Sequence, residues 1–236
     1  MGTCFSFGNK ALQKEAVKLN QVKKIAIIGS GTMGIGIAID ILNKTAYDIL
    51  CIDISDKSLE RAQKDIKDYF LGMAAGGRIL DRQVGDFQKR VSYTQDFKDL
   101  SACEIIWEVA TERLDVKKKI FANIEKYADM KKLLFVFSNT SSHTTAELAV
   151  LFNDSYLRDK FLTGHGYFPF HVNRLFDVMK GKYASEESFM AGVAFAEQVL
   201  EKKVIALRND HHGYVADPIF QGMGAIVSWD IEKGQD

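Results

Sequence analysis

A glycine-rich run near the N-terminal end has the composition and spacing needed to hold a phosphorylated ligand. Gly29, Gly31 and Gly34 lie in the run GSGTMG, which directly follows the apolar residues 23–28. Gly29 permits a tight turn, Gly31 lets the backbone approach a pyrophosphate, and Gly34 permits close packing of a helix on a strand. The backbone N–H groups at the positive end of that helix would then bind the phosphates.

An acidic residue follows at the position where such a loop needs one. Asp53 stands about 20 residues after Gly34, directly after the apolar residues 48–52. A carboxylate there accepts hydrogen bonds from the ribose hydroxyls of NAD and repels the 2′-phosphate of NADP. The alternative is a glycine-rich turn and an unrelated surface Asp, but strand, loop, helix and acid occur in the right order. We therefore predict that NAD is the cofactor and that these residues bind it: Gly29, Gly31, Thr32, Met33, Gly34 and Asp53.

Strands and helices must alternate around this loop to position it. Short apolar runs predict buried strands over 23–28, 48–52, 90–94, 103–109, 132–138, 160–165, 174–180 and 203–207. Helical spacing predicts helices over 32–44, 56–71, 113–128, 144–152 and 186–202, with a looser, partly helical excursion over 72–89. The alternation indicates an α/β fold, a Rossmann-type doubly wound and mainly parallel sheet followed by a C-terminal helix. We expect three parts: an N-terminal extension (1–21), the Rossmann domain (22–208) and the start of a truncated helical domain (209–236).

The composition argues against several classes of function. The chain has 31 Lys plus Arg and 31 Asp plus Glu, so it lacks the basic surplus that nucleic-acid binding requires. Its longest uncharged run, residues 25–39, is too short for a membrane span and contains four glycines. The five histidines show no zinc spacing, so we expect no metal site.

The cysteines and the N-terminal residues bear on location. Cys4, Cys51 and Cys103 show no disulfide framework, which favours a reducing, cytoplasmic compartment. A mitochondrial location is the alternative, although residues 1–24 contain no Arg and make a poor transit peptide. The first residues match a myristoylation pattern at Gly2, with Cys4 placed for a second acyl chain. The other interpretation is a start codon followed by a small residue.

Beyond the glycine loop, five blocks occur in an order typical of one family. They read KKIAIIGSGTMGIGIA, ILCIDIS, WEVATERLDVKKKIF, VFSNTSS and FLTGHGYFPFHVNRLFDVMKG. Over about residues 22–234 the sequence resembles the L-3-hydroxyacyl-CoA dehydrogenase family. The resemblance implies NAD-dependent oxidation of the 3-hydroxyl of a fatty acyl-CoA substrate, a step of β-oxidation.

The resemblance also implies roles for individual residues. His165 matches the general base, and a neutral imidazole suits this because its ordinary pKa lies near working pH. Asp177 falls where the family has a Glu that orients the His, and Ser141 matches the serine that binds the substrate oxygen. Glu112 and Lys117 match residues that contact the cofactor. The alternatives are a strand-end histidine, a helix N-cap at Ser141 and a solvated helix start at Glu112 and Lys117.

Several departures from the family pattern concern the same site. The family reads His-Phe-Phe-Asn-Pro-Pro, whereas this chain reads HGYFPF over 165–170, so the polar Asn has become Phe168. Asp177 is one methylene shorter than the Glu of the family. The family's Pro-Gly-Phe and following Asn-Arg pair are replaced by HGY over 212–214 and by Asp217-Pro218. Phe168, Asp217 and the absent helical domain favour one alternative, a non-catalytic scaffold protein that kept the fold. A second alternative is a dehydrogenase of 3-hydroxy acids that lack CoA, because a fold does not determine its substrate.

The last residues suggest an interface. In the family, an all-helical domain follows the Rossmann domain, and this chain stops within its first helix. A helix over 213–232 would expose a broad apolar surface, which usually marks an interface. We expect this helix to pack on another subunit or on a different protein through these residues: Tyr214, Val215, Ile219, Phe220, Met223, Ile226, Val227 and Ile231.

Overall fold

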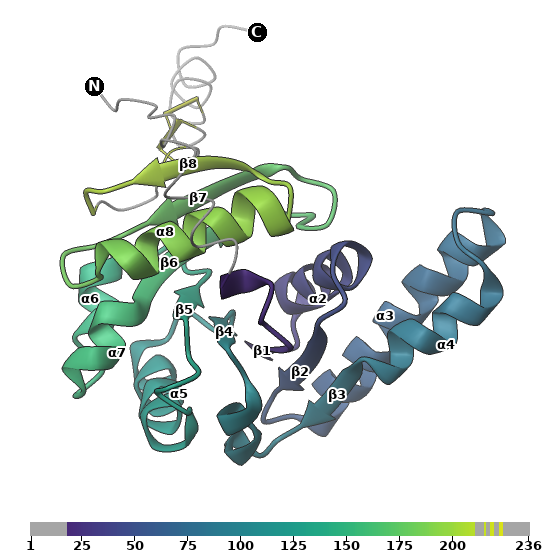
Figure 1. The fold of residues 1–236 in the computed structure, drawn as a ribbon, viewed down its shortest axis with the longest axis horizontal. Helices are drawn as coiled ribbons and strands as arrows, with labels where there is room; N and C mark the ends of the chain where they lie inside the picture. Colours follow the sequence, from purple (N-terminus) through teal and green to yellow (C-terminus); the bar gives the residue numbers. More distant parts are fainter. Residues whose placement is uncertain (1–17, 211–214, 216–217, 220–221, 224–236) are drawn as a thin grey trace, which may run out of the picture.

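The sheet has the strand order of a dinucleotide-binding fold. A computed structural model of the chain describes residues 18–210, 215, 218, 219, 222 and 223. Within these residues, eight strands follow the order β3-β2-β1-β4-β5-β6-β7-β8 (Figure 1), and of these only β6 and β7 pair antiparallel. The strands are β1 (Lys24–Ile28), β2 (Asp48–Ile52), β3 (Val91–Thr94), β4 (Ile105–Glu108), β5 (Phe135–Ser138), β6 (Phe161–Gly166), β7 (Leu175–Met179) and β8 (Lys203–Leu207). The predicted doubly wound, mainly parallel sheet is confirmed.

The strand order creates a crevice at the carboxyl edge of the sheet. The chain runs outward from β1 in one direction through β2 and β3, and in the other direction through β4, β5 and β6. Ile28 pairs with Ile52 on one side and with Glu108 on the other. The residues that follow these three strands therefore leave the sheet together, at the place where open α/β sheets bind ligands.

Both faces of the sheet are covered, because its strands bury side chains on both sides. Ile25 and Ile27 belong to one apolar core, and their neighbours Ala26 and Ile28 belong to the other. Burying a side chain of this size contributes about 1.5–3 kcal/mol. One core is shared with α2 (Thr32–Lys44), α3 (Asp56–Ala75) and α8 (Glu186–Ala194), and the other with α5 (Leu114–Tyr127), α6 (Thr145–Ala149) and α7 (Ser155–Lys160).

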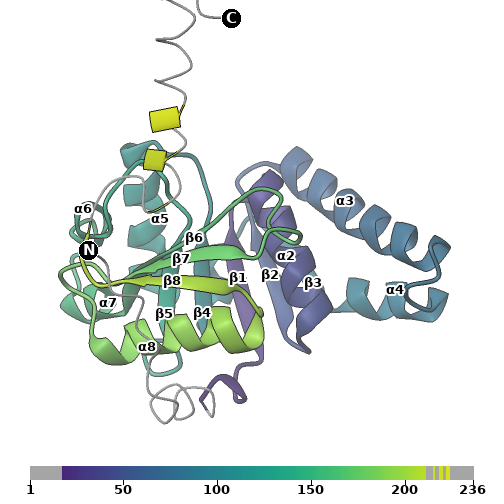
Figure 2. The same ribbon diagram turned by 90° about the horizontal axis from the view of Figure 1, so that it is seen from above.

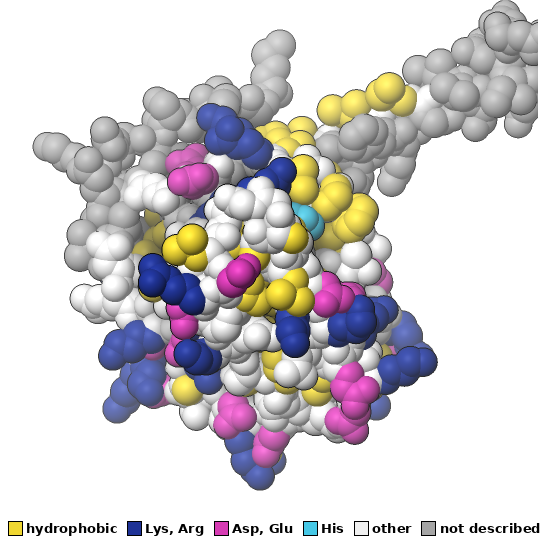
Figure 3. Space-filling model, turned by 90° about the vertical axis from the view of Figure 1, so that its right-hand side faces the viewer, with side chains coloured by type: hydrophobic (Ala, Val, Ile, Leu, Met, Phe, Trp, Pro, Cys, Tyr) yellow, Lys and Arg dark blue, Asp and Glu magenta, His cyan; other side chains and the backbone are white. Residues whose placement is uncertain are grey.

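A helical hairpin extends from one end of the sheet. It consists of α3 and α4 (Asp81–Lys89), and it projects away from the rest of the molecule in both views (Figures 1 and 2). Phe70 stacks on Phe87 with ring centroids 4.1 Å apart, which fastens the two helices together. The segment 72–89 is therefore more helical than the sequence predicted. The surface on this side carries basic and acidic side chains interspersed (Figure 3).

Helices in the second half of the chain also differ from the sequence predictions. The helix expected over 144–152 is α6, which ends at Ala149. Helix α7 was not predicted; it is too short to show periodicity, and Asp154 caps it by accepting a hydrogen bond from the Tyr156 amide at 2.7 Å. The helix expected over 186–202 ends as α8 at Ala194 and continues as a π-helical turn over 195–199.

Several predictions concern segments outside the described residues. Gly2 and Cys4 are among them, and so is most of 213–232. In the part of the chain that the structure describes, no helix is both long and apolar enough to cross a membrane. The same residues contain no group of three or more His, Cys, Asp or Glu side chains that could hold a metal ion.

Candidate active site

The glycine loop has the shape that a dinucleotide needs. Gly29 has φ +112°, and a Cβ at this position would lie 2.8 Å from the carbonyl of Val109. A Cβ on Gly34 would lie 2.0 Å from the carbonyl oxygen of Gly29, so α2 can approach β1 this closely only with glycine there. A Cβ on Gly31, by contrast, would meet no atom of the described residues within 4 Å. Among these residues the space before the helix N-terminus is therefore open, and none of their side chains caps it.

Asp53 lies beside this loop and fixes its conformation. One carboxylate oxygen accepts a hydrogen bond from the Ser30 amide at 2.8 Å, and the other accepts one from the Ser55 amide at 3.0 Å. Each oxygen has two lone pairs, so the carboxylate can still accept from ribose hydroxyls. An open helix N-terminus beside a carboxylate matches the needs of a pyrophosphate joined to a ribose, so these residues fit NAD.

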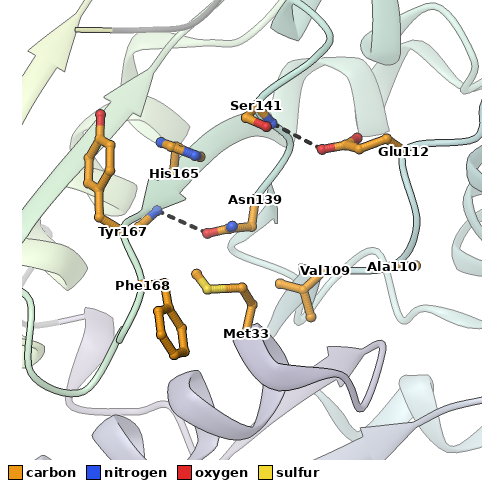
Figure 4. A pocket seen from close by; sticks show the side chains of 10 residues that line it. Met33, Val109, Ala110, Glu112, Asn139, Ser141, His165, Tyr167 and Phe168 are labelled. Atoms are coloured by element: carbon orange, nitrogen blue, oxygen red, sulfur yellow. Dashed lines mark hydrogen bonds between the residues drawn. The ribbon is translucent and has the colours of Figure 1, made fainter. Parts of the chain in front are cut away.

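A cavity of about 360 Å³ opens at the carboxyl edge of the sheet (Figure 4). Its walls come from the start of α2, from the segments after β4 and β5, and from the end of β6 with the residues that follow it. The cavity brings together four predicted catalytic or cofactor-binding residues that are far apart in the sequence: Met33, Glu112, Ser141 and His165. The complete lining is Met33, Val109, Ala110, Glu112, Asn139, Ser141, His165, Gly166, Tyr167 and Phe168.

His165 and Asp177 form a directly opposed pair across β6 and β7. Because these strands are antiparallel and the two residues are in register, their side chains lie on the same face of the sheet. His165 is 6% exposed and Asp177 is fully buried. The Asp177 carboxylate accepts a hydrogen bond from the Tyr167 hydroxyl at 2.7 Å. The structure thus places the acid beside the histidine, with a tyrosine that the sequence analysis did not single out.

Glu112 links the segment after β4 to the segment after β5. Its carboxylate accepts hydrogen bonds from the Thr140 hydroxyl at 2.8 Å and from the Ser141 amide at 3.0 Å. Burial alone would raise the pKa of Glu112, but the Lys117 charge and these hydrogen bonds outweigh it and hold the pKa below its ordinary value. Glu112 therefore carries a negative charge in the cavity wall and fixes the backbone of Ser141.

Lys117 lies at the start of α5, and its burial contradicts one of the two interpretations of the sequence. Its side chain is buried, so the solvated helix start is wrong for this residue, and it is not among the residues lining the cavity. Its ammonium lies 2.9 Å and 3.0 Å from the two carboxylate oxygens of Glu108 and 3.2 Å from Glu112. Lys117 therefore acts on the cavity indirectly, through its ion pair with Glu112.

Three further residues line the cavity, and each has a recognisable feature in the sequence. Asn139 directly follows β5, where polar residues of open α/β sheets meet ligands, and its side-chain oxygen accepts from the Gly166 amide at 2.9 Å. Tyr167 is two residues beyond His165, which is the same-face spacing of a strand. Phe168 was noted as a departure from the family pattern, and in the structure it is 65% exposed at the cavity rim.

The fold and the site define a Rossmann-type protein that binds a nicotinamide dinucleotide. Residues 24–211 match the family described as the NAD binding domain of 3-hydroxyacyl-CoA dehydrogenase. This match covers most of the chain, so the chain belongs to the 3-hydroxyacyl-CoA dehydrogenase family, and its cofactor is NAD.

Relatives of known name agree with this assignment. The chain is 27% identical to a probable 3-hydroxyacyl-CoA dehydrogenase of Caenorhabditis elegans, covering 84% of this chain and 66% of the relative. It is 25% identical to the alpha subunit of the fatty acid oxidation complex of Pseudomonas syringae, covering 89% of this chain and 29% of the subunit. The crystal structure of a (S)-3-hydroxybutyryl-CoA dehydrogenase from Ralstonia eutropha superposes with a TM-score of 0.82 at 25% identity, over 92% of this chain and 74% of that one. The chain thus spans less than two thirds of the first two relatives.

Proposed function

We propose that this protein catalyses the NAD-dependent oxidation of an L-3-hydroxyacyl-CoA to the 3-oxoacyl-CoA. One observation supports this proposal most strongly: His165 and Ser141 line the same cavity, next to the open glycine loop. Asp177 lies beside His165 on the neighbouring strand. The names of the relatives support the substrate class, because 3-hydroxyacyl-CoA and 3-hydroxybutyryl-CoA dehydrogenases are among them.

In this proposal each cavity residue has one task. The His165 imidazole accepts the proton of the substrate hydroxyl, and the buried Asp177 carboxylate stabilises the resulting imidazolium. Ser141 donates a hydrogen bond to the substrate oxygen, from a backbone position that Glu112 fixes. Bound NAD supplies the hydride acceptor. The residues proposed to hold it are Gly29, Gly31, Thr32, Met33, Gly34, Asp53, Glu112 and, through Glu112, Lys117.

The reverse reaction gives the most direct test. Acetoacetyl-CoA and NADH are mixed with the protein, and NADH absorbance is followed. His165→Gln should lower kcat by roughly 10²- to 10⁴-fold while NADH affinity, measured by fluorescence titration, stays unchanged. Tyr183→Phe is the control, because this tyrosine is exposed and lies outside the cavity lining.

Each alternative predicts a different result. Full activity in His165→Gln would remove the histidine from the proposed mechanism. NADH binding without turnover of any acyl-CoA would favour the non-catalytic scaffold, which the departures at Phe168 and Asp217 suggest. Turnover of free acetoacetate in preference to its CoA ester would favour a dehydrogenase of 3-hydroxy acids that lack CoA.

The remaining proposals concern location and association. A cytoplasmic location is consistent with the buried free thiols of Cys51 and Cys103. An interface through residues 213–232 is supported by Ile219 and Met223, which are 57% and 59% exposed. Light scattering at micromolar concentration, with and without residues 213–236, tests association. A monomer of the full chain would contradict the proposed interface.

Acylation at Gly2 and Cys4 is a separate proposal. Mass spectrometry of protein purified from cells tests it.

A further inference from the structure

The carboxylate of Asp177 is buried and depends on the donors around it. A buried charge is costly unless hydrogen bonds compensate for the lost water. One oxygen of Asp177 accepts a bond from the Tyr167 hydroxyl at 2.7 Å and another from the Val215 amide at 3.2 Å. Both donors are neutral. They therefore stabilise the charged carboxylate without adding a positive charge beside His165.

Tyr167 contacts both members of the histidine–acid pair. Its hydroxyl binds Asp177, and its ring meets the His165 ring edge to face, with centroids 4.7 Å apart and an interplanar angle of 82°. Figure 4 shows the two rings side by side at the cavity wall. Its position two residues after His165 at the end of β6 accounts for this, because residues at that spacing lie on the same face of a strand.

Two departures from the family pattern meet at this contact. Tyr167 stands where the family block has Phe, and Asp177 stands where it has Glu. Lengthening Asp177 by one methylene would advance its carboxylate by about 1.5 Å. An oxygen atom already lies 2.7 Å from this carboxylate, so a longer acid and the tyrosine hydroxyl would compete for one volume. The hydroxyl fills the space that a shorter acid leaves.

We propose that Tyr167 is a positioning residue and that Tyr167 and Asp177 form a matched pair. The ring of Tyr167 orients His165, and its hydroxyl holds the shortened acid in place behind the histidine. The inference rests on the proposed function only in taking His165 as the base. The pairing itself is a matter of volume and hydrogen bonding, and measurements without turnover can test it.

A double-mutant cycle tests the pairing through stability. The four proteins are the wild type, Tyr167→Phe, Asp177→Glu, and the double variant, compared by urea unfolding. Tyr167→Phe leaves a buried carboxylate short of one donor, and Asp177→Glu overpacks the site. Each single change should raise the unfolding equilibrium constant by roughly tenfold. The double variant should return to within about threefold of the wild type. Tyr183→Phe, at an exposed tyrosine outside the cavity lining, is the control.

The second measurement observes His165 itself. Imidazole signals of His165, assigned with His165→Gln, are followed by NMR as the pH is varied. The Tyr167 hydroxyl disperses part of the Asp177 charge through its hydrogen bond. Without this hydroxyl, the full carboxylate charge acts on His165 and stabilises the protonated imidazolium more strongly. The titration midpoint of His165 should therefore rise by about 0.5–1 pH unit in Tyr167→Phe. The other carboxylate lining the cavity, Glu112, is common to all four proteins, and a purely structural role for Tyr167 would leave the midpoint unchanged.

Two results would overturn the proposal. One is additivity, in which the double variant is as unstable as the two single changes predict together. The other is a His165 midpoint that is the same in Tyr167→Phe and the wild type. Neither result requires catalysis. Coupling in a protein that turns over no acyl-CoA would leave the pair standing and count against the proposed function alone.

Discussion

The carboxyl edge of the sheet has two halves that hold their functional groups by different means. In the nucleotide half, defined by the ends of β1, β2 and β4, backbone atoms shape the site: Gly34 allows α2 to approach Gly29, and Asp53 binds two amides. In the substrate half, defined by β6, β7 and residues 167–173, side chains do this work. Tyr167 holds Asp177 there, and Lys202 holds the loop.

This difference bears on how each half tolerates change. A site shaped by backbone depends on residue types with special conformations, so substitutions there act through steric clash or repulsion. A site shaped by side chains depends on partners from distant strands, so one substitution leaves another group buried without its partner. We expect the substrate half to accept paired substitutions and the nucleotide half to accept few. The predictions below test this contrast.

The largest effect is expected at Lys202 in the substrate half. Its buried ammonium donates to the carbonyl oxygens of Phe170 at 2.6 Å and Asn173 at 2.8 Å, and it lies 3.0 Å from the Asp40 carboxylate. Lys202→Met removes all three contacts and leaves Asp40 buried with one partner fewer. The free energy of unfolding should fall by about 3–5 kcal/mol, measured by urea denaturation.

The control for this prediction is the next residue along the chain. Lys203 is exposed, so Lys203→Met should change the free energy of unfolding by less than about 0.5 kcal/mol. Equal stability of the Lys202 and Lys203 variants would show that the loop over 167–173 holds its place without the buried ammonium.

In the nucleotide half, two glycines should separate stability from cofactor binding. The Cβ of Gly34→Ala would overlap the Gly29 carbonyl oxygen, so this variant should lose about 1–3 kcal/mol of stability and bind NADH poorly. Gly31→Ala meets no atom within 4 Å, so it should fold normally and bind NADH at least about tenfold more weakly, because its methyl enters the pyrophosphate space. Unchanged NADH affinity in Gly31→Ala would place the phosphates elsewhere.

Asp53 should set the preference between the two nicotinamide cofactors. Asp53→Asn keeps an acceptor beside the loop but removes the charge that repels a 2′-phosphate. The preference for NADH over NADPH, taken from two fluorescence titrations, should fall by about tenfold, or about 1.4 kcal/mol. A wild-type protein that binds both cofactors equally would contradict the role of this carboxylate.

The same contrast explains what the sequence could predict. Glycine spacing and apolar runs predicted the loop and the eight strands, because both are local properties of residue type. Tyr167 as a partner of Asp177 depends on the antiparallel register of β6 and β7, which spacing along the chain does not reveal. The burial of Lys117 within the run of three lysines at 117–119 depends on which face of α5 meets the sheet. Local signals therefore located the nucleotide half, and only the fold revealed the side-chain contacts of the substrate half.

The smallest effect is expected at His171, at the junction of the loop over 167–173 with α3. Its ring meets the Tyr69 ring of α3 at 5.0 Å, and its pKa is lowered, first by burial and also by the Lys202 charge, against an opposing effect of Asp40. A histidine with a lowered pKa in the folded state is protonated more readily when unfolded, so protonation favours unfolding. Stability should therefore fall as the pH drops below about 6.5, until the lowered pKa is passed. His171→Gln should flatten this part of the curve of Tm against pH, measured between about pH 5 and pH 8. Parallel curves for variant and wild type would mean that His171 does not respond to pH at the junction and that other groups cause the dependence.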